Sequence, residues 1–215
     1  MIPREPDPMN KNSRSPMTAP LLAAVLSAAL STVSLPAQAQ AAPLSSSAGQ
    51  ATLDNNADLQ RLRDADQAAR SPGRDNIDWS IVAKQDQERR VEVLALLKAG
   101  KARTSADYYN AAMVYQHGDG VEDIRQAHAL ASIATLLQPD HKPALWLRAA
   151  SWDRLLMRLN KPQWYGTQFT KPEGSDLWEL YKVDESAVTD ADRAALGVRP
   201  LAAAKAQVER MNSKR

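Results

Sequence analysis

His117 and Asp153 are two residues of this 215-residue chain whose types suit acid–base chemistry in one pocket. Asp153 falls on the same face of an expected helix as Trp146, Ala150 and Met157, so its carboxylate should be at least half buried. A buried carboxylate needs hydrogen-bond donors, and an imidazole can supply one. Held in one tautomer by that carboxylate, His117 would act as a general base near neutral pH. Water or a substrate hydroxyl would be the nucleophile, because the chain has no cysteine.

A set of polar residues near this pair is expected to bind a ligand at the mouth of the same pocket. Its members are Gln116, Arg154, Gln163, Tyr165, Thr167 and Gln168. Arg154 points about 100° around the helix from its neighbour Asp153. We therefore expect it to hold a second element, such as Asp184 or a main-chain carbonyl.

The same residues have a structural interpretation, which we favour at this stage. Asp153, Arg154 and His117 would dock a β-hairpin onto the helices, with every hydrogen bond satisfied inside the protein. The sequence contains no Ser nucleophile elbow and no phosphate-binding glycine loop, so a complete catalytic set is not evident. The catalytic interpretation stays open beside this one.

Metal and cofactor sites are not predicted. His117, His128 and Asp123 flank one tight turn, but the sequence has no H-E-x-x-H motif and no cysteine pair. We interpret His128 as a core or turn-capping residue and His141 as a surface residue at a helix start. The prediction is therefore no metal ligand and no cofactor.

The composition and net charge of the chain exclude some classes of protein. The chain has 27 Lys and Arg against 25 Asp and Glu, a net charge of +2, and 44% hydrophobic residues. This balance excludes the dense basic face of a nucleic-acid-binding protein and is typical of a globular chain. The absence of cysteine excludes disulfides.

The N-terminal segment has the parts of a secretory signal peptide. Lys11 and Arg14 precede an apolar run from Leu21 to Leu35, and the segment Ala37–Ala41 offers cleavage after Ala39 or Ala41. The run is shorter than the ~20 residues that span a bilayer. We expect a signal peptide over 1–39, with Met9 as a possible true start, and a flexible leader over 40–51. The mature protein would be periplasmic or secreted, with no membrane span.

Residues 52–212 should form a single helical domain. Helix signals cover 53–70, 78–97, 107–117, 122–137, 140–160, 190–196 and 201–211. The aromatic and β-branched segment 164–170 and the alternating segment 177–183 predict one β-hairpin. The fold class is mainly α, with antiparallel helical hairpins that pack as in tetratricopeptide or Sel1-like repeats. The Sel1-like turn, with Tyr115, Gly118, Gly120 and Asp123, covers about one repeat, so we expect one or two hairpins rather than a solenoid.

An ordered series of short motifs resembles an uncharacterised bacterial family whose domain has no known function. The series is Gln116-His117, Asp153-Arg154, Gln163, Tyr165-Gly166-Thr167-Gln168-Phe169 and Gly197-x-x-Pro200-Leu201. The resemblance covers about 86–211, and it departs from the family at 101–104, where many relatives have a Gly-Trp-Pro turn. Because no activity is established for the family, the resemblance implies where a site lies but not which chemistry it performs.

Two function classes follow. The first is an exported helical interaction or ligand-binding module of the bacterial envelope, with an unknown protein or a small molecule as its partner. The second is a hydrolase or transferase that uses a His117–Asp153 dyad beside the Tyr-Gly-Thr-Gln segment. Trp164 and Trp178, on the expected hairpin, are core residues in our interpretation, and a platform for stacking a sugar is the alternative.

Overall fold

The computed structural model describes residues 53–71 and 76–213. The expected signal peptide (1–39) and the whole of the expected leader (40–51) lie outside these residues, as does residue 52. The described part belongs to one compact unit of the chain. It contains no helix long and apolar enough to cross a membrane.

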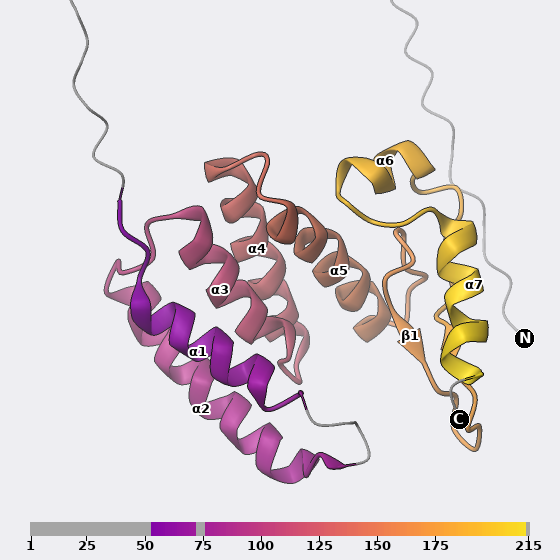
Figure 1. The fold of residues 1–215 in the computed structure, drawn as a ribbon, viewed down its shortest axis with the longest axis horizontal. Coiled ribbons are helices and arrows are strands. Elements are labelled where there is room, and N and C mark those ends of the chain that lie inside the picture. The colour runs from indigo at the N-terminus through magenta and orange to yellow at the C-terminus, as the bar shows by residue number, and fades with distance from the viewer. Residues whose placement is uncertain (1–52, 72–75, 214–215) are drawn as a thin grey trace, which may run out of the picture. The chain divides into compact units, whose positions relative to one another are not determined.

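The first part of the fold is a group of helices packed through consecutive pairs. They are α1 (Ala57–Ala68), α2 (Trp79–Lys98), α3 (Ser105–Gln116), α4 (Val121–Leu137) and α5 (Lys142–Arg158). α3 packs against α4 and α4 against α5, while α1 lies against both α2 and α3 (Figure 1). The prediction of a mainly α fold built from helical hairpins is confirmed.

Capping residues set the helix starts much as the sequence indicates. Asp78 accepts from the backbone N–H groups of Ser80 and Ile81 and starts α2. Thr104 and Asp107 form a reciprocal capping box that starts α3. These side chains satisfy donors that the first turn of a helix leaves without partners.

The core lies mainly between α1, α3 and α4, and α2 and α5 contribute one buried side chain each. It contains mostly Ala, Leu and Val side chains, with Tyr115 as its one buried aromatic residue. Small side chains let the helices approach closely, which suits hairpin packing. Among its fully buried members are Leu59, Leu62, Val93, Val114 and Leu147.

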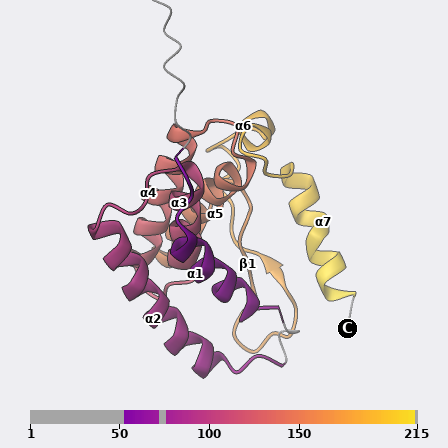
Figure 2. The same ribbon diagram turned by 60° about the vertical axis from the view of Figure 1, so that its left-hand side comes forward.

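The C-terminal part contains the β-hairpin and two further helices. β1 (Phe169–Thr170) pairs antiparallel with β2 (Glu179–Leu180), and α6 (Asp190–Ala195) and α7 (Leu201–Asn212) follow. In both ribbon views α7 lies beside the strand pair (Figures 1 and 2). Asn212 binds the backbone of Trp178 in both directions and holds the end of α7 to the hairpin.

The hairpin is confirmed, but its strands are shorter than predicted. The sequence predicts extended strands over 164–170 and 177–183, whereas each strand has two residues. Backbone N–H groups of Trp164, Tyr165 and Thr167 donate to the Asp153 carboxylate. Because a carboxylate accepts these donors, they cannot join a β-ladder, and the segment forms a loop over α5 instead.

Candidate functional site

His117 and Asp66 form the central pair of the candidate site. Nδ1 of His117, the residue that ends α3, lies 2.9 Å from Oδ2 and 3.0 Å from Oδ1 of Asp66 on α1. Asp66 is fully buried, and it also accepts from Arg70 Nη1 at 2.9 Å and from Gln67 Nε2 at 2.8 Å. The predicted pairing of His117 with Asp153 is therefore wrong, because Asp66 occupies that position.

Asp153 has a structural role. Its fully buried carboxylate accepts from the backbone N–H groups of Trp164, Tyr165 and Thr167 and from the Thr167 hydroxyl, at 2.8 to 3.0 Å. Both oxygens are thus occupied by the loop that follows α5. The carboxylate anchors this loop to the helix, as the structural interpretation of the sequence expects for Asp153.

The Asp66–His117 pair belongs to a larger buried charge network. Arg70 bridges Asp66 to Asp86 on α2, and Arg89 donates to the same Asp86 carboxylate at 2.5 Å. Burial acts to raise the pKa of Asp86, but the hydrogen bonds from Arg70 and Arg89 outweigh it and hold that pKa below its usual value. The network fixes α1 against α2 next to the imidazole.

Arg154 connects the end of α3 to the loop after α5. Its Nη1 donates to the Gln116 carbonyl at 2.7 Å, and its Nε donates to Gln168 Oε1 at 3.0 Å. The prediction that Arg154 holds a second element through a main-chain carbonyl is confirmed. Asp184 is bound elsewhere, since its carboxylate accepts from Ser186.

Gln163 and Gln168 are tied into the protein interior. The fully buried Gln163 amide donates to the Gln168 and Tyr181 carbonyls and accepts from Gln168 N. Gln168 donates to the Ala150 carbonyl and to the Thr167 hydroxyl. Gln163 therefore shapes the loop and does not line the cavities beside His117, whereas Gln168 and Thr167 reach one of them.

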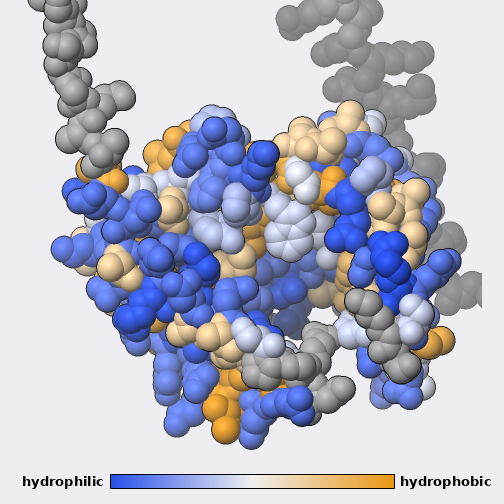
Figure 3. Space-filling view, viewed as in Figure 1, coloured by the Kyte–Doolittle hydropathy of each residue, from blue (hydrophilic) through white to orange (hydrophobic). Residues whose placement is uncertain are grey.

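Two cavities meet at His117 and Arg154. The first, which we call the groove, has a volume of about 560 Å³, and its polar wall includes Gln116 and Gln168. Its apolar wall consists of Met113, Trp146, Phe169, Trp178 and Met211. The second cavity, of about 490 Å³, is lined by charged residues, which include Arg70, Asp86 and Arg158, and by apolar residues, which include Ile77, Trp79 and Val82. Figure 3 shows this face hollowed between the α1–α2 side and the α7 side, with a hydrophilic floor.

The His117 side chain lines both cavities, and one of its ring nitrogens has no protein partner in the described residues. Nδ1 faces a carboxylate, which accepts a hydrogen bond, so the neutral ring carries its proton on Nδ1 and a lone pair on Nε2. Nε2 has no hydrogen-bond partner among residues 53–71 and 76–213, and the side chain is 20% exposed. This arrangement can accept a proton or a hydrogen bond from a bound molecule.

Tyr165 does not lie with the other predicted binding residues. It lines a separate cavity with His128 and Trp152, whereas Thr167 lines the groove. Gly166, between them, has a φ of 80°, a conformation that glycine adopts without strain. The chain turns there, so side chains on either side of Gly166 line different cavities.

The three histidines are held in different places. His128 Nδ1 lies 3.1 Å from the Arg148 carbonyl, and His141 Nδ1 lies 2.6 Å from the Ser105 hydroxyl. Within the part of the chain that the structure describes, no group of three or more His, Asp or Glu side chains could hold a metal ion.

Asp66 and Arg70 are not among the predicted site residues, although the position of Asp66 in the sequence carries a signal. Asp66 follows Leu62 by four residues and Leu59 by seven, so it falls on the buried face of α1. A carboxylate on an apolar face must find donors. Arg70, four residues further on, is at ion-pair spacing.

In comparisons with known proteins, no protein-family model, no curated protein and no solved structure matches the chain. The chemistry of the site therefore rests on its own residues.

Proposed function

We propose that this protein is an exported ligand-binding module of the bacterial envelope, and that a small molecule binds in the groove. The observation that carries the proposal is the His117 ring. Its Nδ1 is fixed by buried Asp66, its side chain lines both cavities, and Nε2 has no protein partner in the described residues. An oriented acceptor at the junction of two cavities suits recognition of a ligand hydroxyl or N–H group.

A second polar atom supports the same conclusion. The Gln116 side chain lines the groove and is only 4% exposed, yet its buried Oε1 has no hydrogen-bond partner in the described part of the chain. Leaving a buried polar atom unpaired costs about 1–3 kcal/mol. A donor group of a bound molecule in the groove would recover this energy.

The apolar wall of the groove adds contact area. Trp146 is 43% exposed, and Phe169 and Trp178 lie on the hairpin side of the same groove. Aromatic walls with a few convergent polar groups are typical of small-molecule sites. The ligand would therefore combine an apolar body with at least one hydrogen-bond donor.

The N-terminal sequence and the family resemblance extend the proposal. The basic residues, apolar run and Ala-x-Ala segment support export to the periplasm or beyond. The groove also gathers several residues of the ordered motif series, namely Gln116, His117, Arg154, Thr167 and Gln168. We propose that the resembled family shares this groove.

Native mass spectrometry tests the ligand directly. The mature protein would be purified from the envelope of its own host, together with His117→Gln and the control His141→Gln, whose side chain lies outside the groove. We expect a stoichiometric small-molecule adduct on the wild-type and control proteins and its loss from His117→Gln. A bare mass for the wild-type protein, or an adduct retained by His117→Gln, would overturn the proposal.

A second candidate function is a hydrolase or transferase. The specific observation is that Asp66 and His117 form the carboxylate–imidazole arrangement of a general base, although with a different aspartate from the predicted one. Nε2 would take a proton from water or from an acceptor hydroxyl while the oxygen of that group attacks the substrate. The protonated ring would then donate this proton to the leaving group. Turnover of a p-nitrophenyl ester panel, lost in His117→Gln, would support this function. Equal turnover by wild type and His117→Gln would contradict the hydrolase or transferase function.

A further inference from the structure

A separate cavity of about 340 Å³ lies among α4, α5 and the loop after α5. We call it the aromatic pocket, and its lining consists of His128, Arg148, Trp152, Trp164, Tyr165 and Leu196. None of these residues lines the groove or the charged cavity beside His117. An inference about this pocket is therefore independent of the proposed function.

Tilted and edge-to-face rings form the walls of the aromatic pocket. The Trp152 and Trp164 rings meet edge to face with centroids 5.0 Å apart, and the His128 ring lies 5.3 Å from Trp152. Each ring is fixed by its neighbour, so the walls keep their shape without a ligand. Such walls favour a ligand that contains a ring.

Polar groups at the tips of these side chains have unused hydrogen-bonding capacity. The Trp152 Nε1–H is buried and has no acceptor within residues 53–71 and 76–213. The Tyr165 hydroxyl likewise forms no hydrogen bond with any described residue. A buried N–H without a partner costs about 1–3 kcal/mol, which an oxygen atom of a ligand would recover.

Arg148 supplies positive charge to the aromatic pocket. Its Nη1 donates to the Thr135 hydroxyl at 3.2 Å, and no acidic side chain in the described ranges forms an ion pair with it. A partly buried guanidinium without an acidic partner attracts a carboxylate, which it can bind through two hydrogen bonds. The charge therefore favours an anionic ligand.

His128 supplies an acceptor. Its Nδ1 faces the Arg148 carbonyl at 3.1 Å and must carry the ring proton there, so Nε2 of the neutral ring has a lone pair. Burial, and then the nearby Arg148 charge, lower the pKa of His128 despite the hydrogen bond to the carbonyl. A ligand hydroxyl is a suitable donor to Nε2.

We propose that the aromatic pocket binds a small carboxylic acid that contains a ring and a hydroxyl group. The carboxylate pairs with Arg148, the hydroxyl donates to His128 Nε2, and the ring packs against Trp152 and Trp164. The Trp152 N–H and the Tyr165 hydroxyl bind the remaining ligand oxygens. Aromatic hydroxy acids and sugar acids share this chemistry, and the experiment distinguishes them.

NMR titration of the mature protein tests the pocket at a single atom. The indole N–H resonance of Trp152, assigned with Trp152→Phe, would be followed during addition of 4-hydroxybenzoate and glucuronate, and of the neutral amide of each acid, 4-hydroxybenzamide and glucuronamide. We expect one of the two acids to shift this resonance in a saturable way, which identifies the source. The neutral amide should bind about tenfold more weakly than the corresponding acid.

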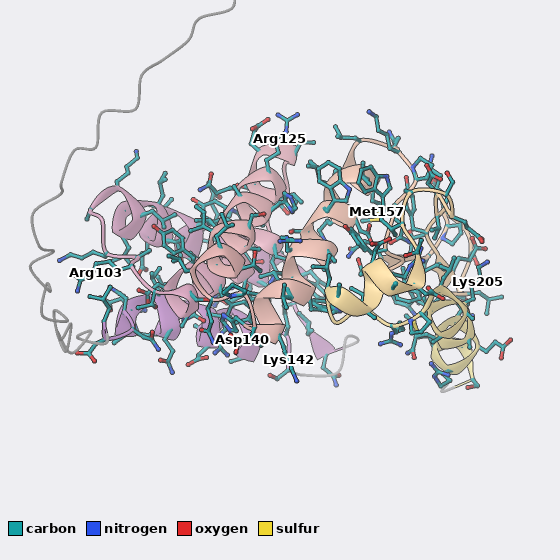
Figure 4. All side chains as sticks on the ribbon, turned by 90° about the horizontal axis from the view of Figure 1, so that it is seen from above. Arg103, Arg125, Asp140, Lys142, Met157 and Lys205 are labelled. Carbon is teal, nitrogen blue, oxygen red and sulfur yellow. The ribbon has the colours of Figure 1, made fainter. Side chains whose placement is uncertain are left out.

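Variants assign the binding to named groups. Arg148→Gln should weaken acid binding about tenfold or more, and Tyr165→Phe, which removes one hydroxyl, about threefold or more. The control is Arg125→Gln on α4, since the Arg125 side chain is exposed and projects away from the protein (Figure 4). This control should bind the acid as the wild type does.

The proposal fails under defined results. It is overturned if neither acid shifts the Trp152 resonance, or if Arg148→Gln binds the acid as tightly as the wild type. Should Arg148→Gln unfold, the amide analogue and Tyr165→Phe decide instead. Equal affinity of the wild type for acid and amide, or unchanged affinity in Tyr165→Phe, would then overturn it.

Discussion

The Asp66 carboxylate and the His117 imidazole, 51 residues apart in the chain, meet with 2.9 Å between Oδ2 and Nδ1. This contact joins α1 to the end of α3 at a histidine that lines two cavities. It brings a buried acid and a partly exposed base together at one point of the fold. The tautomer of the base therefore depends on a residue of another helix.

The first prediction concerns that tautomer. We expect the neutral His117 ring to carry its proton on Nδ1, because the Asp66 carboxylate accepts from that atom. Asp66→Ala should remove this preference, while the spectrum of His141 stays unchanged. The measurement is the ¹⁵N chemical shift of the ring nitrogens. A ring protonated on Nε2 in the wild-type protein would show that the contact does not set the tautomer.

The second prediction concerns the Asp153 anchor. In Asp153→Asn one acceptor oxygen becomes an NH₂ group that faces backbone donors, so the loop after α5 loses hydrogen bonds. We expect the free energy of unfolding to fall by about 2–4 kcal/mol. Urea denaturation measures this change.

The matched control for the anchor is Asp176→Asn, at an exposed position of the hairpin turn. It should change the free energy of unfolding by about 0.5 kcal/mol or less. Equal effects of the two substitutions would contradict the anchoring role of Asp153.

The third prediction concerns the turn between α3 and α4. A Cβ atom on Gly118 would meet the Asp123 Cβ, whereas one on Gly120 has ordinary contacts at 3.9 Å and beyond. Gly118→Ala should therefore lower the free energy of unfolding by about 2–3 kcal/mol. Gly120→Ala, at the N-cap of α4, should cost about 0.5–1 kcal/mol. Thermal unfolding of both variants gives the comparison, and the reverse order would contradict this account of the turn.

The fourth prediction concerns pH. Burial lowers the pKa of His128 below its usual 6.5 in the folded protein, so the unfolded chain binds the proton more readily. Stability from this residue is complete above pH 6.5 and is lost as the pH falls through the folded pKa. The lowered pKa of Asp86 acts in a more acidic range, below its usual 3.8.

The test is unfolding by urea at several values between pH 7.5 and pH 5. The wild-type protein should lose stability as the pH falls, and His128→Gln should lose less over the same range. Burial also lowers the pKa of His141, so the variant keeps part of the slope. Identical slopes in the two proteins would rule out His128 as a source of the pH dependence.

Local signals were sufficient to predict the helices. Asp78 and Thr104 each bind the first turn of their own helix, so their effect can be identified without tertiary structure. The hairpin was predicted with strands that are too long, because its donors bind Asp153 on another element. A contact across elements competes with the local β pattern, and the sequence does not show which one prevails.

The candidate site was predicted in part. His117 and Arg154 lie together as expected, and Arg154 holds a main-chain carbonyl. The acid that orients His117 was assigned to the wrong helix, because α1 is charged and only weakly apolar. Tyr165 was predicted in the wrong cavity. The turn that separates it from Thr167 needs a positive φ at Gly166, and the presence of a glycine permits such a φ but does not show that it occurs.

Asp153 holds the loop mainly through backbone N–H groups, which every residue type except proline possesses. The side chains at 164 and 165 are therefore not needed for the anchor, although both line the aromatic pocket. Substitution there can alter what the pocket recognises while the loop stays in place. Asp153 must therefore be retained for the loop to stay in place, whereas the side chains at 164 and 165 can change and so alter the specificity of the pocket.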